Sequence, residues 1–87
     1  MKELSAREKS YIYERVADIT EQLEKEISDI TVELEDVANK HDERKTEDPE
    51  NYNADSWEYR YNVDNIDRMG KRRHALREIV DYLNKMA

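Results

Sequence analysis

The side chains that could do chemistry in this 87-residue chain are mostly carboxylates, because it holds 22 Asp and Glu, two His and no Cys. The absence of Cys excludes a thiol nucleophile, and a single Gly excludes a Gly-rich loop that would hold phosphate. Neither His41 nor His74 follows a carboxylate by three residues, so the Glu-x-x-His metal motif of helical bundles is missing. The acidic residues at 42–50 lack the spacing of a calcium loop. We therefore expect no enzyme activity, no cofactor and no bound metal.

Six further carboxylates recur at helical spacing along residues 14–36, and they are Glu14, Asp18, Glu21, Asp29, Glu33 and Asp36. The surrounding region is strongly acidic, since residues 18–67 contain 17 Asp and Glu against 5 Lys and Arg. Such an acidic row can serve solubility alone. It can also imitate a nucleic-acid backbone and bind the basic groove of a nucleic-acid-handling protein. Both interpretations remain open at the level of sequence.

A basic block occupies residues 68–77, and its candidate nucleic-acid contacts are Arg68, Lys71, Arg72 and Arg77. The alternative is intramolecular: the block would lie against acidic residues of the preceding helix, and opposite charges would fix the alignment of the two helices. The net charge of the chain is −7, which disfavours bare nucleic acid as a partner. We favour the intramolecular interpretation and keep nucleic-acid binding as the alternative.

Aromatic side chains are numerous for so polar a chain, with six Tyr and one Trp. Tyr and Trp frequently anchor protein interfaces, and the candidate interface residues are Tyr11, Tyr13, Trp57, Tyr59, Tyr61 and Tyr82. Residues two apart on a helix point about 200° apart, so each of the two Tyr-x-Tyr pairs has at least one outward ring. The aromatic residues can instead cap the ends of a coiled coil, so docking and capping both remain open.

One stretch dominates the apolar pattern and would position these side chains. Between residues 12 and 37 the apolar positions are three and four residues apart, at Ile12, Val16, Ile19, Leu23, Ile27, Ile30, Leu34 and Val37. This spacing predicts a single stripe on an α-helix of about residues 5–44, which begins at a capping box formed by Ser5 and Glu8. Several apolar residues also recur at eleven-residue intervals, which predicts a nearly straight helix pair in the middle.

The pattern disappears across an acidic connection at about residues 45–55, and a second helix is predicted at about residues 56–85. Its inward stripe comprises Tyr59, Asn62 or Val63, Ile66, Met69, Arg73, Leu76, Val80 and Leu83. A second apolar edge of this helix, including Ile79 and Met86, is where another copy or another protein would dock. Gly70 lies inside the helix and is interpreted as a bend or a close helix contact.

Matching the two stripes predicts an all-α, antiparallel two-helix hairpin of the coiled-coil kind, with residues 1–87 as one domain. In the predicted register Val37 faces Tyr59, and Leu23 faces Arg73. A hairpin buries only one stripe per helix, and so small a core usually needs a cross-link or a partner. We therefore expect a homodimer that forms a four-helix bundle.

These observations predict a small acidic interaction protein without enzyme activity, most simply a regulator or inhibitor that binds another protein. The preferred partner is a basic or nucleic-acid-handling protein, bound through nucleic-acid mimicry. The alternatives are a nucleic-acid-binding module that uses residues 68–77 and a homotypic scaffold. No apolar run approaches the ~20 residues of a membrane span, and the N-terminus lacks a signal-peptide core. We expect a cytoplasmic protein without membrane contact, located in the host cytoplasm if a phage or plasmid encodes it.

Overall fold

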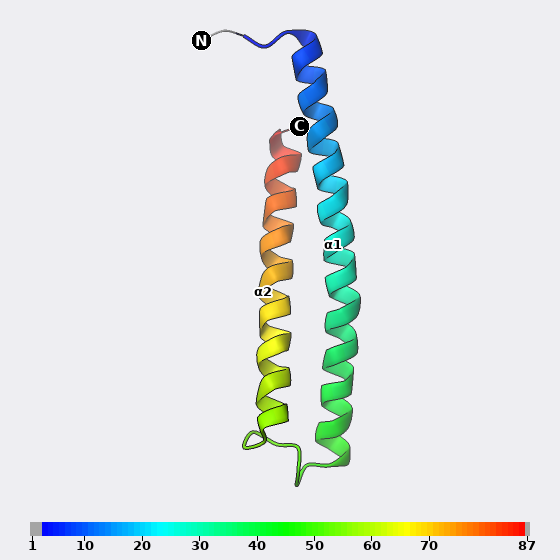
Figure 1. Cartoon of the computed structure of the whole chain (residues 1–87), viewed down its shortest axis with the longest axis vertical. Helices are drawn as coiled ribbons and strands as arrows, with labels where there is room; N and C mark the ends of the chain where they lie inside the picture. Colours follow the sequence, from blue (N-terminus) through cyan, green and yellow to red (C-terminus); the bar gives the residue numbers. More distant parts are fainter. Residues whose placement is uncertain (1–2, 87) are drawn as a thin grey trace.

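The computed structural model describes residues 3–86 and contains two antiparallel α-helices (Figure 1). Helix α1 comprises Ala6–Glu47, helix α2 comprises Trp57–Met86, and the connection 48–56 reverses the chain. The hairpin is elongated, with extents of 67 × 22 × 15 Å. The predicted all-α helical hairpin is therefore confirmed, and residues 3–86 contain no β-strand.

Local chemistry sets both ends of α1. Ser5 is the N-cap: the Glu8 backbone N–H donates to Ser5 Oγ (3.2 Å), and the Ser5 backbone N–H donates to Glu8 Oε1 (3.1 Å). These two hydrogen bonds are the predicted capping box. At the other end α1 continues to Glu47, beyond the expected end at residue 44. It stops there because Asp48 precedes Pro49, and the proline ring forces the preceding residue out of helical backbone angles.

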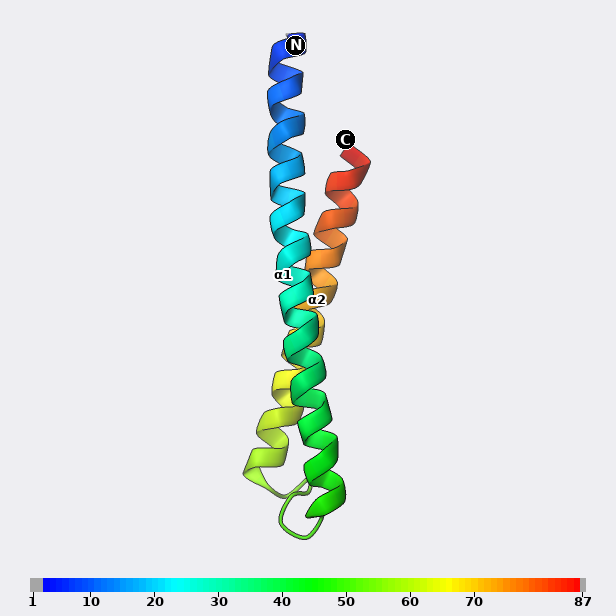
Figure 2. The ribbon, with the colours of Figure 1, turned by 90° about the vertical axis from the view of Figure 1, so that its right-hand side faces the viewer.

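The inward face of α1 alternates steps of four and three residues. Its buried or half-buried positions are Val16, Thr20, Leu23, Ile27, Ile30, Leu34, Val37 and His41. This face departs from the predicted stripe at two places. Ile12 is 41% exposed, and Thr20 turns inward in place of Ile19, which is 46% exposed. Heptad spacing is typical of two helices that coil around each other. Figure 2 shows α2 crossing behind α1, so the two helices are inclined to each other. The nearly straight middle section stays a prediction.

The inward face of α2 follows the predicted stripe from Tyr59 to Leu83. Between the two candidates for its second position, Asn62 turns inward and Val63 stays 43% exposed, although Val is the more apolar side chain. The reason is a hydrogen bond, because the Asn62 amide donates to the Tyr52 hydroxyl (2.8 Å).

Gly70 does not mark a close helix contact. It lies within regular helix, and its backbone has no positive φ angle. A Cβ placed on it would meet none of the described atoms within 4 Å. The expectation of a tight contact at this position is therefore wrong, and an added Cβ has room there.

The register of the hairpin lies one helical turn away from the predicted one. The rings of His41 and Tyr59 pack with centroids 4.7 Å apart, although Val37 was predicted to face Tyr59. Arg73 is displaced in the same direction and donates to Thr31 Oγ1 (3.5 Å). The shift arises because α1 continues for about one more turn before the chain reverses.

The interior between the helices is small. Among residues 3–86 the buried aliphatic side chains are Ile30 and Val80, and Tyr52 and His41 are buried near the connection. The chain exposes 7266 Å², whereas a compact monomer of this length exposes about 5,400 Å². The N-terminal turns of α1 also project beyond the C-terminal end of α2 (Figures 1 and 2). A large surface therefore stays open to solvent, and the helix pair is incomplete near the termini.

Candidate interaction surfaces

A cluster of rings closes the tip of the hairpin, where the connection meets both helices. Tyr52 comes from the connection, is completely buried, and packs against His41 of α1 and Tyr59 of α2. Its ring centroid lies 5.3 Å from that of His41 and 5.2 Å from that of Tyr59. The Tyr52 hydroxyl lies 2.5 Å from His41 Nδ1 and accepts a hydrogen bond from Asn62. One loop residue thus joins both helices.

Side chains from both helices contact the buried Tyr52. Its hydroxyl and His41 Nδ1 share one hydrogen bond, whose donor depends on the tautomer of the imidazole. The Arg44 guanidinium covers the Tyr52 ring, 4.5 Å from its centroid, and pairs with Glu58. The hydrogen bond that Arg44 donates to Glu58 raises the pKa of Arg44. Because Tyr52 is inaccessible, we assign the cluster a structural role.

The candidate aromatic interface residues divide into two groups. Tyr59 faces α1 within the tip cluster and is half-buried. The other five are exposed, and they are Tyr11, Tyr13, Trp57, Tyr61 and Tyr82. Trp57 and Tyr61 stack on each other, with centroids 5.4 Å apart and an interplanar angle of 17°. Of the Tyr59 and Tyr61 pair, the first therefore packs in the tip cluster and the second faces solvent.

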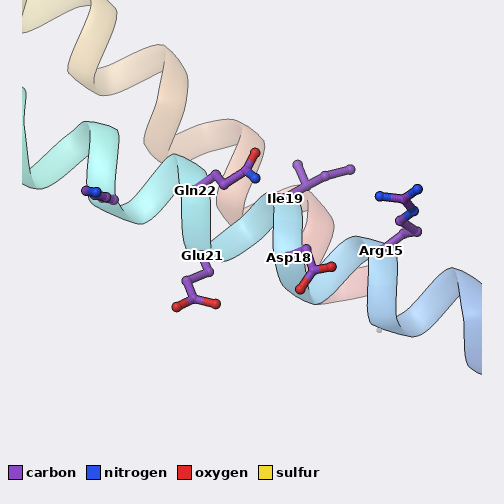
Figure 3. Close-up of a pocket in the computed structure, with 6 residues that line it drawn as sticks. Arg15, Asp18, Ile19, Glu21 and Gln22 are labelled. Atoms are coloured by element: carbon purple, nitrogen blue, oxygen red, sulfur yellow. The ribbon is translucent and has the colours of Figure 1, made fainter.

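All six candidate carboxylates of the acidic row are exposed on α1, and they are Glu14, Asp18, Glu21, Asp29, Glu33 and Asp36. Figure 3 shows Asp18 and Glu21 pointing to one side of α1, away from Ile19. Within residues 3–86, the one ion pair that involves the row joins Asp36 to Lys40 (3.0 Å). The row is therefore a line of largely unpaired negative charges on one continuous helix.

The basic block meets carboxylates of its own chain. Its four candidate contacts are exposed, and they are Arg68, Lys71, Arg72 and Arg77. Arg72 pairs with Glu26 of α1 (2.6 Å), which is the kind of contact between helices that the intramolecular interpretation requires. Lys71 pairs with Asp67 one turn earlier (2.9 Å), and this hydrogen bond raises the pKa of Lys71. Arg77 makes no ion pair with the described part of the chain.

Four of the apolar side chains that are exposed near the termini form what we call the terminal flank: Ile12, Ile19, Ile79 and Met86. Ile79 and Met86 belong to the apolar edge that the sequence indicates as a docking surface. Ile12 and Ile19 were expected to face α2 and are instead 41% and 46% exposed. Beside them, Thr20 Oγ1 is buried and has no hydrogen-bond partner among residues 3–86. This arrangement was not predicted, because Ile19 was assigned to the inward stripe.

Residues 3–86 hold no group of three His, Cys, Asp or Glu that could bind a metal ion. Within the same part of the chain, neither helix is both long and apolar enough to cross a membrane. The acidic row, the stacked aromatic pair and the terminal flank are therefore the surfaces on which a function can be proposed. The chain matches no protein-family model, no curated protein and no solved structure.

Proposed function

We propose that this protein is a non-enzymatic interaction protein, an acidic regulator or inhibitor that binds a basic surface of a nucleic-acid-handling protein in the cytoplasm. The observation that carries the proposal is the acidic row of α1, of which only Asp36 has an ion-pair partner within residues 3–86. Carboxylates without internal partners keep their attraction for a basic surface, and a line of them steers its approach.

The length of the acidic row supports imitation of a nucleic acid. From Glu14 to Asp36 the row extends about 33 Å at the rise of an α-helix, which is close to one turn of duplex DNA, about 34 Å. One continuous helix carries the row, so its backbone is already ordered before binding. These properties suit a partner whose groove binds phosphates.

The basic block gives less support to direct nucleic-acid binding, which is the alternative function. Three of its four candidate contacts already pair with carboxylates of this chain. A phosphate would have to replace those carboxylates to gain the full attraction of the block. The net charge of −7 also repels a polyanion.

We further propose that the protein acts as a homodimer, in which two hairpins form a four-helix bundle. The chain exposes about 1,800 Å² more surface than a compact monomer of its length. A standard protein interface covers about 800 Å² on each partner, so the excess is large enough for a stable dimer. Asp18 and Glu21 point away from Ile19 (Figure 3), so a dimer formed over Ile19 leaves these carboxylates accessible.

The test of the acidic row is displacement of DNA from its binding protein. Proteins retained by this chain from a nuclease-treated lysate of its source cells are identified, and the nucleic-acid-binding ones are purified. Each is bound to fluorescent duplex DNA, and this protein is titrated into the complex. We expect stoichiometric release of the DNA, measured as a fall in fluorescence anisotropy. A partner that binds this protein and its DNA together would contradict the mimicry.

Two charge-matched variants separate the acidic row from net charge. The first carries Asp18→Asn with Asp29→Asn in the row, and the second carries Glu43→Gln with Glu47→Gln, which are exposed near the tip. Both variants lose the same charge. We expect the row variant to weaken DNA displacement about tenfold or more and the tip variant to stay near the unmodified protein. Equal weakening by both variants would show that net charge alone acts.

A further inference from the structure

The four residues of the terminal flank occupy the same heptad positions as the two residues of an ion pair that joins the helices. Glu26 of α1 pairs with Arg72 of α2 across one side of the hairpin. The positions one and two heptads before Glu26 are both Ile, and those one and two heptads after Arg72 are Ile and Met. Because the helices are antiparallel and keep heptad spacing, these positions share the side of the ion pair. They are the four residues of the terminal flank.

The rest of residues 3–86 covers the terminal flank only in part. Its four side chains are between 41% and 56% exposed, and the end of α1 next to them projects beyond α2 (Figure 1). Apolar side chains at these heptad positions are the ones that four-helix bundles bury between neighbouring helix pairs. The flank is therefore the part of the hairpin where a further helix pair would complete the packing.

We propose that the terminal flank is covered by a second copy of this chain, with the connections of both hairpins at the same end. This inference rests on the proposed self-association and specifies its face and its direction. A twofold axis then runs along the hairpins, and each α1 packs against the partner's α2. In this arrangement Ile19 meets the partner's Ile79, and Ile12 meets the partner's Met86. In each of these two contacts, both side chains are apolar.

The charged positions further along the same side of the hairpin support this direction. Towards the tip, Glu26 meets the partner's Arg72, and Lys40 meets the partner's Glu58. The heptad position between them brings Glu33, the one member of the acidic row on this side, against the partner's Asn65. Opposite charges at such positions fix the alignment of helices, and like charges disfavour it. Towards the tip, this side thus has two layers of opposite charge and no layer of like charge.

The opposite direction gives a poorer match. With the connections at opposite ends and full overlap, α1 packs against the partner's α1. Ile12 and Ile19 then lie near the partner's Lys40 and Glu33, and the apolar side chains lose much of the burial that would stabilise the dimer. A short overlap of the terminal ends restores apolar contact but leaves the paired charges of Glu26 outside the interface. The arrangement with both connections at the same end keeps the apolar contacts and also the charge pairs within the interface.

Single engineered cysteines test the direction, because the chain has no Cys of its own. Ile19→Cys and Ile79→Cys variants are mixed and treated with a short bismaleimide, so that every cross-link joins two chains. A Val32→Cys variant is the control, since Val32 is 66% exposed on a different side of α1. We expect the mixture of I19C and I79C to give a cross-linked dimer. I19C alone, and V32C mixed with I79C, should give little.

Light scattering of the unmodified protein separates the outcomes. A dimer mass together with the cross-link between I19C and I79C supports the inference. A dimer mass with efficient cross-linking of I19C to itself overturns the direction and leaves the proposed self-association intact. A monomer mass at every concentration overturns both the dimer and the inference. None of these outcomes bears on DNA displacement by the acidic row, which is measured separately.

A charged substitution on the terminal flank gives a second readout. Ile19→Glu places two carboxylates in the proposed interface of each dimer, and we expect the dissociation constant to rise about 100-fold or more. Val32→Glu adds the same charge outside the interface and should leave the dissociation constant within about threefold. Circular dichroism checks that both variants keep their helices. If both variants weaken the dimer equally, the terminal flank is not its interface.

Discussion

At the closed end of the hairpin a residue of the connection, Tyr52, is completely buried, whereas at the open end α1 leaves Ile12 and Ile19 exposed. The closed end also satisfies its polar groups, since the Tyr52 hydroxyl contacts both His41 and Asn62. The open end does not, because Thr20 Oγ1 is buried without a partner among residues 3–86. The same helix pair is therefore complete at one end and incomplete at the other.

The difference shows how a two-helix protein can compensate for its small core. A pair of helices has only one seam, and Tyr52 adds a third layer of packing at the tip without adding a third helix. No equivalent residue exists at the open end of the described chain, where the helices end at different heights (Figure 2). A second chain can provide at the open end the packing that Tyr52 of the connection provides at the tip.

The largest effect is expected from removing the ring that closes the tip. Tyr52→Ala should lower the free energy of unfolding by about 3–5 kcal/mol, because it empties a buried site and removes two hydrogen bonds. The matched control is Tyr82→Ala, since Tyr82 is 65% exposed, and it should stay within about 0.5 kcal/mol. Urea denaturation at one fixed protein concentration measures both. Similar losses in the two variants would remove the distinction between the ends.

The next largest effect is expected from removing the Tyr52 hydroxyl while keeping its ring. Tyr52→Phe keeps the packing but leaves the Asn62 amide and His41 Nδ1 without their shared partner. We expect a loss of about 1–3 kcal/mol in the free energy of unfolding, the usual cost of a buried polar group without a partner. A loss equal to that of Tyr52→Ala would mean that the hydrogen bonds, and not the ring, close the tip.

At the open end the corresponding substitution should stabilise the protein. Thr20→Val keeps the shape of the side chain and removes the buried hydroxyl that has no partner among residues 3–86. We expect a gain of about 1–2 kcal/mol, because no desolvated oxygen is left uncompensated. Thermal denaturation measures the gain as a higher Tm. A lower Tm would indicate that the hydroxyl has a hydrogen-bond partner, such as a buried water.

The sequence predicted the parts of the fold that depend on neighbouring residues. The capping box needs only Ser5 and Glu8 in the right spacing, and it formed as expected. The inward stripe of α2 was also predicted, because its residues recur every three or four positions along the chain. The acidic row could also be identified, although its lack of internal partners became visible only when the positions of Lys and Arg were known.

The sequence did not predict what depends on the partner helix or on the connection. Ile19 was placed inside because it is more apolar than Thr20, yet the coiling of two helices selects the heptad position and not the apolar one. The register was misplaced because it depends on where Pro49 ends α1. Tyr52 was grouped with the rings that can cap an end of the coiled coil, but its complete burial was not predicted. Loop residues show no periodicity, and this burial follows from contacts with both helices.

A smaller stabilisation is expected at Gly70, between the two ends. Gly70→Ala adds a Cβ that meets no described atom within 4 Å, so the substitution introduces no clash. Ala is the better helix former because Gly loses more backbone freedom on folding, and we expect a gain of about 0.5–1 kcal/mol. Urea denaturation of the variant measures it. No gain would imply that the helix is already frayed or kinked at this position in solution.

The smallest effect concerns pH at the beginning of α1. Hydrogen bonds from the backbone and the hydroxyl of Ser5 lower the pKa of Glu8 below its ordinary value. The stabilisation by this carboxylate is complete above the ordinary glutamate pKa of about 4.3. It is lost as the pH falls through the lower pKa of the folded protein, so acid should loosen the N-terminal turn.

A Glu8→Gln variant provides the control, because Gln can form the same capping box and does not titrate. NMR titration of the Glu8 carboxyl should give a pKa below the ordinary glutamate value of about 4.3. Hydrogen exchange of the first helical amides, corrected for its intrinsic pH dependence, should accelerate as the pH falls through this lower value. The corrected exchange of the Glu8→Gln variant should not change there. If Glu8 titrates at the ordinary value, the capping box is open in solution, and the open end of the hairpin is less ordered than its hydrogen bonds indicate.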